Sequence, residues 1–518
     1  DYGEVVVNSW FSGKKSSLSH FAVGTIDNLL LLGLKQKHLF LRHLGFSDKV
    51  VIIDEVHAYD VYMSSYLKKA LQWLGAYHVP VIALSATLPI DKRNELLKAY
   101  LKGKYNSKIV TGPANWQKNK AYPLLSMLDG QGIKQVTDFE IPQDERRKVE
   151  IIRFKGNEQD IVNKALSEIS NGGVAGIIVN TVKRAQAIAQ LLPNDVETLV
   201  LHSEFLAPER ERLENRLQKA IGKNAKRPSK MVVIGTQVLE QSLDIDFDVL
   251  FTDIAPIDLI IQRIGRLHRH NINRPKDLEK PKAYITSIND FGDYGDGNKF
   301  IYGNYLLMKT DHFLKDSIEI PQDVSTLVQD VYDENNDDSI DGIQDAKDDF
   351  VNKVNKLKEK AKQFQIKKPL FKHPVSLSGW LNDSQINVEN DNHAAACVRD
   401  IEETIELVLL KHTADGNCLL DGRMLENVSS EEIASQTIRL PIAVSNNLNK
   451  RIPDKIGESI NKLEKIRLEN YPNWSKDIWL HGVLALTLNE QDEVSFNGYR
   501  LHYSESLGLM YEKEDADA

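Results

Sequence analysis

Residues 50–60 read V-V-I-I-D-E-V-H-A-Y-D, an apolar run that ends directly in Asp54, Glu55 and His57. Four consecutive apolar residues are typical of a buried parallel strand, and functional groups often follow the C-terminal end of such a strand. In phosphoanhydride hydrolysis one carboxylate can hold Mg²⁺ on the phosphates while the next acts on the attacking water. The alternative is an ordinary strand end with solvated acids. The apolar run and the D-E-x-H spacing favour a nucleotide site.

Composition sets the protein class. The chain has 518 residues, of which 42% are hydrophobic and 27% are charged, and this predicts a soluble globular protein of two to four domains. The sequence contains no run of about 18 uncharged apolar residues, so no membrane span is predicted. Two cysteines, Cys397 and Cys418, exclude a disulfide scaffold and fit a reducing, cytoplasmic setting. A net charge of −9 argues against a generally basic coat, but it allows a local basic channel.

Strand and helix patterns alternate from about residue 45 to residue 290, which predicts an α/β protein with parallel sheets covered on both faces. A polar connector at 105–146 separates two such units. The first unit is expected to be cut short at its N-terminus. Strands are predicted at 50–53, 80–84, 148–154, 174–179, 196–201, 231–235 and 248–252, and helices at 61–75, 91–102, 157–170, 181–192, 207–221 and 257–268.

The composition changes near residue 290. Residues 329–349 are rich in Asp and Asn and predict a solvated connection, whereas 346–364 has the spacing of one helix with a basic face. The segments after 370 are shorter and favour strands at 398–411, 437–444, 479–488 and 499–511, which predicts a small α+β domain. The expected domains are therefore a partial first α/β domain (1–146), a second α/β domain (147–290), a linker with a long helix (291–369) and an accessory domain (370–518).

Two further motifs follow predicted strands. Ser85-Ala86-Thr87 follows the strand at 80–84, and its hydroxyl groups could hydrogen-bond the acidic pair and relay the nucleotide state. Thr236 and Gln237, in G-T-Q-V-L-E-Q-S-L-D-I-D (235–246), offer hydrogen-bond groups to a nucleic-acid backbone, and Asp244 could reach a ribose hydroxyl. Each motif has an ordinary alternative: turn chemistry for the first, and a strand–helix turn with a capping Asp for the second.

The fourth motif is I-I-Q-R-I-G-R-L-H-R-H, residues 260–270. On a helix, Gln262, Arg266 and Arg269 would fall at i, i+4 and i+7 and share one face. Planar guanidinium groups can neutralise the charge that develops on a transferred phosphoryl group. The alternative is a solvated basic helix face, but the order of the motifs along the chain favours a phosphate site.

The ordered set D-E-V-H, S-A-T, G-T-Q…D and Q-R-x-G-R-x-x-R resembles a superfamily 2 helicase, which has two RecA-like domains. Four segments are similar in sequence to the type I CRISPR-associated helicase–nuclease: D-E-V-H-A-Y-D, L-S-A-T-L-P (84–89), L-H-S-E-F (201–205) and Q-R-I-G-R-L-H-R-H. The similarity is strong over about residues 20–290 and weaker in 394–410. It implies an ATP-dependent single-stranded DNA translocase and helicase that the Cascade surveillance complex recruits to invader DNA.

The resemblance also implies roles for individual residues. Asp54 and Glu55 would serve Mg²⁺ and water, with His57 beside them, and Ser85, Ala86 and Thr87 would couple ATP state to the grip on DNA. Glu204 departs from the family, which more often has a basic residue there, so no DNA contact is predicted at that position. The other implied roles are γ-phosphate contacts by Gln262, Arg266 and Arg269, nucleotide binding by Asp244, Arg263 and Gly265, and DNA contacts by Thr25, Asn180, Thr181, Thr236 and Gln237.

Two parts of the family pattern do not occur in the sequence. The chain has no G-x-x-x-x-G-K-[ST] phosphate loop, and the nearest string, S-G-K-K-S-S (12–17), fits an exposed basic loop better. None of the 14 histidines is followed by Asp, so the His-Asp nuclease domain and its divalent metal are not expected in this chain. Together with Asp1 as the first residue, these observations predict that the chain is the C-terminal portion of a longer protein. The chain by itself is then expected to be ATPase-deficient. The open alternatives are a non-catalytic nucleic-acid or partner-binding fragment, or an RNA helicase of the same superfamily.

Overall fold

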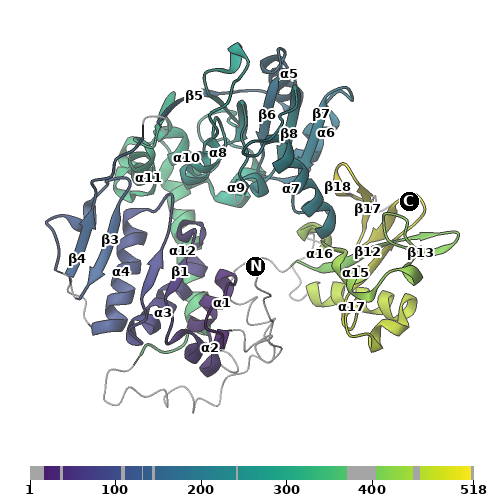
Figure 1. Ribbon diagram of the computed structural model, residues 1–518, viewed down its shortest axis with the longest axis horizontal. Coiled ribbons are helices and arrows are strands. Elements are labelled where there is room, and N and C mark those ends of the chain that lie inside the picture. The colour runs from purple at the N-terminus through teal and green to yellow at the C-terminus, as the bar shows by residue number, and fades with distance from the viewer. Residues whose placement is uncertain are drawn as a thin grey trace, which may run out of the picture. The chain divides into compact units, whose positions relative to one another are not determined.

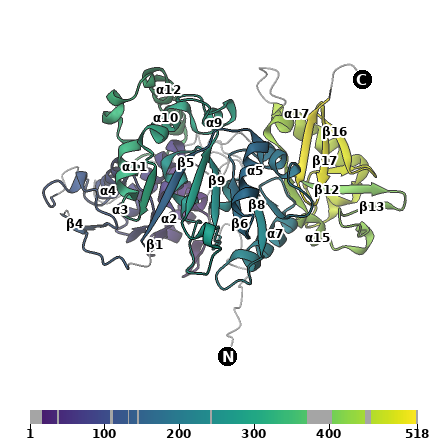
Figure 2. The same cartoon turned by 90° about the horizontal axis from the view of Figure 1, so that it is seen from above.

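The computed structural model describes residues 17–35, 39–106, 111–130, 132–142, 146–240, 243–369, 404–446 and 455–514 (Figures 1 and 2). The chain divides into two compact units, one formed by 1–147 and 319–401 and the other by 148–318 and 402–518. Most of the basic string at 12–17, and Cys397, lie outside the described residues. The four domain ranges expected from sequence stay a prediction.

The first unit contains the strand that precedes the acidic pair. Strand β1 (Val51–Ile53) pairs in parallel with β2 (Val81–Ala83), and α3 (Val61–Ala76) connects them as expected. Asp60 begins α3 because its side chain accepts the N–H of Met63 at 2.7 Å, a standard N-cap. Helix α4 (Ile90–Tyr105) follows β2 and packs against α3.

A distant part of the chain completes the core of this unit. Helix α12 (Ile343–Phe364) packs against α3 and lies beside it in Figure 1, and α1 (Ile26–Leu30) also packs against α3, with α2 (Leu39–Phe46) next in the chain. Ala361 of α12 is fully buried in the core, and Ile366 donates its N–H to Gly33 O at 2.9 Å. The prediction of a solvated connection at 329–349 is wrong. This segment contains the end of α11 (Val324–Tyr332), a 3₁₀ helix (Glu334–Ser339) and the start of α12.

The polar connector expected at 105–146 is also more structured than its sequence indicates. It contains a 3₁₀ turn (Trp116–Lys118) and an antiparallel hairpin of β3 (Leu125–Asp129) and β4 (Gly132–Val136). Arg93 of α4 holds the turn by donating to the carbonyls of Trp116 and Asn119. The hairpin escaped sequence analysis because its strands have only five residues each and lie in a largely polar segment.

One face of the β1–β2 pair is exposed, which contradicts the expectation of sheets covered on both faces. Ile52 and Ile82 are direct cross-strand partners, yet they are 65% and 47% exposed. Val51 and Ile53 point the other way and are buried in the core. The alternation of burial along β1 is therefore that of a sheet packed on one side only among the described residues.

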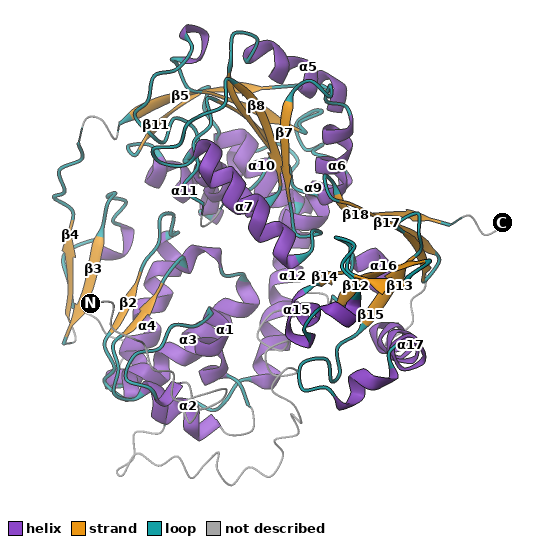
Figure 3. Ribbon diagram, turned by 45° about the vertical axis from the view of Figure 1, so that its right-hand side comes forward, coloured by secondary structure: helices purple, strands orange, loops and turns teal. Residues whose placement is uncertain are grey.

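The second unit is built on a seven-stranded sheet with the order β11-β5-β10-β9-β6-β8-β7. Figure 3 shows its strands as one layer with helices on both faces. The strands from β5 to β7 pair in parallel, and the expected strands and helices of this unit are confirmed within about two residues, except for the end of α8. The strands are β5 (Arg147–Arg153), β6 (Gly173–Ile178), β7 (Glu197–Leu201), β8 (Lys230–Gly235), β9 (Val249–Asp253), β10 (Lys282–Thr286) and β11 (Ser317–Ile320), and the helices are α5 (Glu158–Glu168), α6 (Val182–Gln190), α7 (Ala207–Ile221), α8 (Ile257–Ile264), α9 (Asp296–Tyr302) and α10 (Asn304–Phe313).

The C-terminal part of the second unit is α+β, as predicted. Strand β12 (Glu406–Thr413) pairs with β13 (Gly416–Cys418), β14 (Thr437–Arg439) and β15 (Ala485–Leu488). The strand expected at 437–444 is wrong beyond Arg439, since α16 (Ile442–Asn446) begins there, and 499–511 is not one segment but two strands of a sheet. That sheet comprises β16 (Glu493–Phe496), β17 (Tyr499–Ser504) and β18 (Gly508–Lys513). The same part of the chain also contains the helices α15 (Ser430–Ser435) and α17 (Lys455–Asn470). Within the described ranges no helix has the length and apolarity to span a bilayer.

Candidate nucleotide and nucleic-acid sites

The acidic pair lies at the C-terminal end of β1, and both of its carboxylates are exposed. Glu55 has a φ of 51°, a left-handed backbone that is costly for a residue with a side chain and is concentrated at functional sites. The backbone N–H of Glu55 donates to Asp54 Oδ1 at 2.9 Å. Buried His57 lies with Nε2 3.3 Å from Glu55 Oε2 and Nδ1 3.0 Å from Ser85 Oγ. The two motifs are therefore joined through His57.

The S-A-T motif contacts the histidine rather than the carboxylates themselves, which corrects the expected partner. Ser85 is the bridging residue, while Ala86 is exposed and Thr87 is buried with no hydrogen-bond partner for its hydroxyl among the described atoms. Lys92 of α4 fixes the 3₁₀ turn at Val56–Ala58, because it donates to His57 O at 3.1 Å and to Tyr59 O at 2.6 Å. This lysine was missed at the sequence level because it lies outside every motif.

In the second unit, polar residues gather at the carboxyl edge of the parallel sheet. Ile178 of β6 is level with Gly235 of β8 and Thr252 of β9, so the residues after these strands meet at one edge. Asn180 makes six hydrogen bonds there, four of them through its side chain, and is almost fully buried. Its side chain is thus hydrogen-bonded within the protein, and the DNA contact expected of Asn180 stays a prediction.

Arg263 on α8 is fully buried beside this edge. Its Nε lies 2.7 Å from Glu240 Oε1, and its Nη2 lies 2.8 Å from Asn180 Oδ1. Burial alone would lower the pKa of Arg263, but the neighbouring Glu240 carboxylate more than offsets this and holds the pKa above its ordinary value. In this arrangement Arg263 contacts protein groups and not solvent, so it has the geometry of a residue that positions Asn180 and Glu240.

The helix that was expected to carry three phosphate-facing residues ends too early for that arrangement. Helix α8 ends at Ile264 with Gly265 as its C-cap, so Gln262 lies on the helix while Arg266 and Arg269 lie beyond it. The prediction that these three residues share one face of a helix is therefore wrong. Arg266 Nη1 and Nη2 instead donate to the carbonyls of Leu243 and Glu240 at 2.6 and 2.7 Å, and these bonds tie the loop to the segment after β8.

Asp244 is also placed by this loop. Arg269 Nε and His270 Nε2 lie 2.7 and 3.0 Å from Asp244 Oδ1. Partial burial would raise the pKa of Asp244, but the hydrogen bonds from His270 and Arg269 hold it below its usual range. Arg269 and Asp244 are both partly exposed, so either side chain can turn toward a bound anion or ribose.

A buried ion-pair cluster below the loop was missed by sequence analysis. Asp246 accepts the N–H of Arg269 at 2.8 Å and a guanidinium N–H of Arg274 at 2.7 Å. Asp248 accepts from Arg227, from Arg274 and from the N–H of Val174 at the start of β6. No local motif announces these residues, because they come from four separate segments that only the sheet brings together.

The remaining predicted nucleic-acid contacts have different degrees of exposure. Thr25 is exposed at the N-cap of α1, and its side chain makes no capping bond. Thr181 caps α6 by accepting the N–H of Arg184, and its hydroxyl proton stays available for a further bond. Gln237 is half-buried and donates to Asn180 O and Tyr302 OH, whereas Thr236 is buried.

Glu204 lies in a contact between the helicase-like and C-terminal parts of the second unit. The N–H of Leu509 on β18 donates to Glu204 O at 2.8 Å, and Gln186 of α6 donates to the carbonyls of Leu507 and Leu509. Glu204 Oε2 is buried without a hydrogen-bond partner among the described atoms. Burial raises the pKa of Glu204 to about 8, against a smaller opposing effect of Lys183. The acid therefore faces protein.

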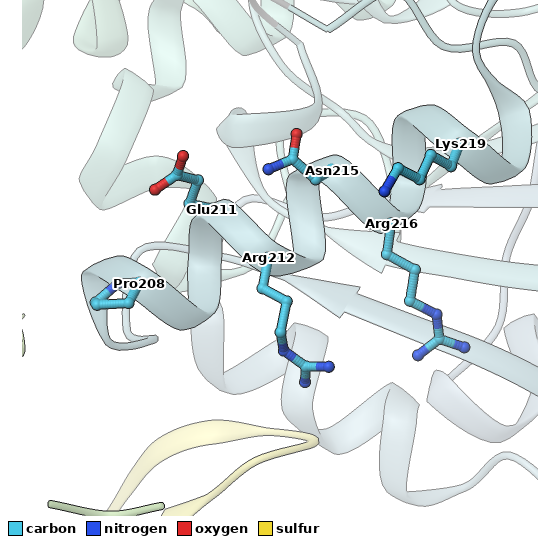
Figure 4. Close-up of a pocket in the computed structure, with 6 residues that line it drawn as sticks. All are labelled: Pro208, Glu211, Arg212, Asn215, Arg216 and Lys219. Atoms are coloured by element: carbon cyan, nitrogen blue, oxygen red, sulfur yellow. The ribbon is translucent and has the colours of Figure 1, made fainter.

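A shallow hollow of about 560 Å³ lies on α7 and is lined by the six residues of Figure 4. Arg212 pairs with Glu209 and Arg216 pairs with Glu197, so two of its three cations are already neutralised. We assign no ligand to it. Among the described residues no group of three His, Cys, Asp or Glu side chains is placed to hold a metal.

The exposed carboxylates of Asp54 and Glu55 fit a magnesium ion that arrives with a nucleotide. Mg²⁺ takes oxygen ligands and is usually held by one or two carboxylates together with substrate phosphates and water. Such an ion needs no larger cluster of protein ligands. The residues present at the end of β1 thus match the donor set that a metal–nucleotide complex requires.

Two family models match the chain. One, described as CRISPR-associated nuclease/helicase Cas3, C-terminal, matches residues 171–272, and the other, the Cas3 C-terminal domain, matches 399–509. Over both of these segments the chain is similar to Cas3 proteins. The CRISPR-associated nuclease/helicase Cas3 of Streptococcus thermophilus is 43% identical to it over 99% of this chain and 56% of that relative.

Solved structures show the same fold. A crystal structure of a CRISPR-associated protein has a TM-score of 0.78 at 30% identity and covers 96% of this chain and 55% of the other. The T. fusca Cas3–AMPPNP structure has a TM-score of 0.81 at 25% identity, with coverages of 97% and 58%. The chain therefore spans little more than half the length of these proteins, and the large parallel sheet of its second unit is that of Cas3 helicase domains.

Proposed function

We propose that this chain is the helicase part of a CRISPR interference helicase–nuclease that uses ATP and Mg²⁺ to move along single-stranded DNA. The observation that carries the proposal is the connection from Glu55 through His57 to Ser85, with Glu55 in a strained left-handed conformation. A link between the acidic pair and the next strand end provides a physical route from nucleotide state to the rest of the domain. The AMPPNP complex of the similar T. fusca protein supports nucleotide as the ligand.

In this proposal Asp54 holds Mg²⁺ on the phosphates and Glu55 orients the attacking water. His57 keeps Glu55 in place and passes a change in its position to Ser85, and Thr87 lies two residues farther along the chain. Gln262, Arg266 and Arg269 contact the γ-phosphate, and Asp244 contacts the ribose. Arg263 and Gly265 support this group: Arg263 through its buried bonds, and Gly265 by ending α8 so that the loop can turn.

Single-stranded DNA is the proposed track. Thr25 in the first unit and Thr181, Thr236 and Gln237 in the second would contact its sugar–phosphate backbone, with Asn180 holding Gln237 and Arg263. Cascade is the proposed partner, because the relatives are named as CRISPR-associated proteins. The nuclease activity in the name of those relatives would require a metal-binding part that we do not place on any residue of this chain.

The test uses the longer protein that contains this chain. Arg266→Ala should abolish DNA-stimulated ATP hydrolysis, since a single arginine of this kind contributes roughly 10³–10⁵ in rate. Arg212→Ala on α7, which removes an exposed arginine paired with Glu209, is the matched control and should retain turnover. Retained DNA-stimulated turnover in the Arg266 variant would refute the assigned role.

We further propose that the isolated 518-residue chain hydrolyses ATP negligibly, because its sequence has no phosphate-loop motif to cradle the triphosphate. The measurement is phosphate release by the purified chain with and without single-stranded DNA. Robust DNA-stimulated release would overturn this proposal without touching the helicase assignment. Repeating the unwinding assay of the longer protein on RNA duplexes separates a DNA helicase from an RNA helicase.

A further inference from the structure

Helix α9 is bonded to three of the predicted site residues at once. Asn180 Nδ2 donates to Asn298 Oδ1 at 2.8 Å, and the hydroxyl of Tyr302 lies 3.2 Å from Gln237 Nε2 and 3.4 Å from Arg263 Nη2. Asn298 and Tyr302 are one helical turn apart, so they point to the same side of α9. The inner side of this helix is therefore fixed to the carboxyl edge of the parallel sheet.

The outer side of α9 carries a solvent-exposed aromatic side chain, Phe300. Phe300 is 72% exposed, although its helix is held by the buried Asn298 on the opposite side. The first turn of α9 also lies against Thr181, since a Cβ placed on Gly297 would be 3.5 Å from Thr181 Cγ2. Phe300 follows Gly297 by three positions, which places it about one turn along the helix from that contact.

A single exposed apolar residue is common on protein surfaces and by itself carries no assignment. Here two observations separate Phe300 from such residues. Its backbone is rigidly held by side-chain bonds to the strand edge, and that edge holds the groups to which we assign the DNA backbone. A strand of nucleic acid fixed by its phosphates at Thr181 and Gln237 leaves its bases to be covered.

We propose that Phe300 is a stacking platform for a base of single-stranded nucleic acid, and that α9 positions it through Asn298 and Tyr302. Every base has a flat π face, so an aromatic ring beside a phosphate track binds single strands without strong sequence preference. Next to Thr181, the N-terminal turn of α6 contributes a positive dipole end, which suits the phosphates. This inference rests on the proposed function, because Thr181 and Gln237 are its backbone contacts.

The test measures binding of a fluorescently labelled oligothymidylate to the complete 518-residue chain by anisotropy. Phe300→Ala should weaken binding about 5- to 150-fold, the usual loss for one stacked base. Phe300→Trp should keep the affinity and add a tryptophan emission that is quenched when the oligonucleotide binds. Ile478→Ala is the control, since it removes an apolar side chain that is 91% exposed elsewhere in the same unit.

The outcomes separate the platform from the proposed function. If Phe300→Ala binds within twofold of the parent chain while Thr181→Ala is weakened, the platform is refuted and the DNA track stands. If the parent chain does not bind the oligonucleotide at all, both fall. Equal losses by Phe300→Ala on single-stranded and blunt duplex DNA would also overturn stacking, because the bases of a duplex are not available to the ring.

Discussion

The substitution Glu204→Gln tests the contact between the helicase-like and C-terminal parts of the second unit. Gln has nearly the same shape as protonated Glu but cannot ionise. The groups around Glu204 are Lys183 on α6, His202 after β7 and Tyr511 on β18. Burial lowers the pKa of His202 to about 4 and raises the pKa of Tyr511 to about 12, so neither titrates between pH 5 and 9. Within that window Glu204 is the group in this contact whose charge changes.

The magnitude follows from the pKa. Because the pKa of Glu204 is about 8 in the folded contact and 4.5 when the carboxyl is exposed, the closed form binds more protons between these values. Its free energy of opening therefore falls as the pH rises from 4.5 to 8, and is then constant. At 1.36 kcal/mol for each factor of ten in the ionisation constant, the largest loss is about 5 kcal/mol. Water entry and side-chain relaxation will reduce it, and about 2–3 kcal/mol is the expected order.

Hydrogen exchange of the peptide that contains Leu509 measures this opening, since its N–H is bonded to Glu204 O. Comparing variant and parent at the same pH cancels the intrinsic exchange rate. At pH 5 the Gln variant should exchange only about fourfold more slowly, because the carboxyl of the open form is already partly ionised, whereas at pH 9 it should exchange about 30- to 150-fold more slowly. Glu211→Gln on the exposed side of α7 is the control and should match the parent at both values. A variant-to-parent ratio that is the same at pH 5 and pH 9 would refute the reasoning.

Three further predictions concern stability. Asp246→Asn should destabilise the second unit by about 3 kcal/mol, because it leaves Asp248 as the one carboxylate of this buried ion-pair cluster to neutralise both Arg227 and Arg274; urea unfolding checks this, and an unchanged midpoint would contradict it. Ala361→Leu should cost about 1–3 kcal/mol by overpacking the first core, while Asn355→Leu on the exposed side of α12 should not; equal thermal midpoints would show that α12 does not belong to that core. Asp60→Ala should cost about 1 kcal/mol through loss of the α3 N-cap, with Asp60→Asn nearly neutral by the same urea assay.

Sequence patterns predicted β5 to β9 and α5 to α7 of the second unit within about two residues, because each of these elements is decided locally. Strands such as V-A-G-I-I-V are continuously apolar and are bounded by helices with one apolar face, which leaves only a parallel sheet as a stable arrangement. The same approach failed at 105–146 and 329–349. Those segments are polar enough to resemble solvated loops, yet the first contains a hairpin whose strands pair with each other, and the second begins α12, which packs against α3 from a distant part of the chain.

The candidate sites divide in the same way. The sequence by itself determined which groups end the strands, since Asp54, Ser85 and Thr236 each follow an apolar run directly. Tertiary structure alone decided which of these groups face solvent and which are committed to the protein. Asn180 and Arg263 have motif positions but are buried in mutual hydrogen bonds, and Arg266 lies past the end of its helix. The physical reason is that a motif specifies chemistry by local spacing, whereas burial and hydrogen-bond partners depend on segments such as α9 that arrive from elsewhere in the chain.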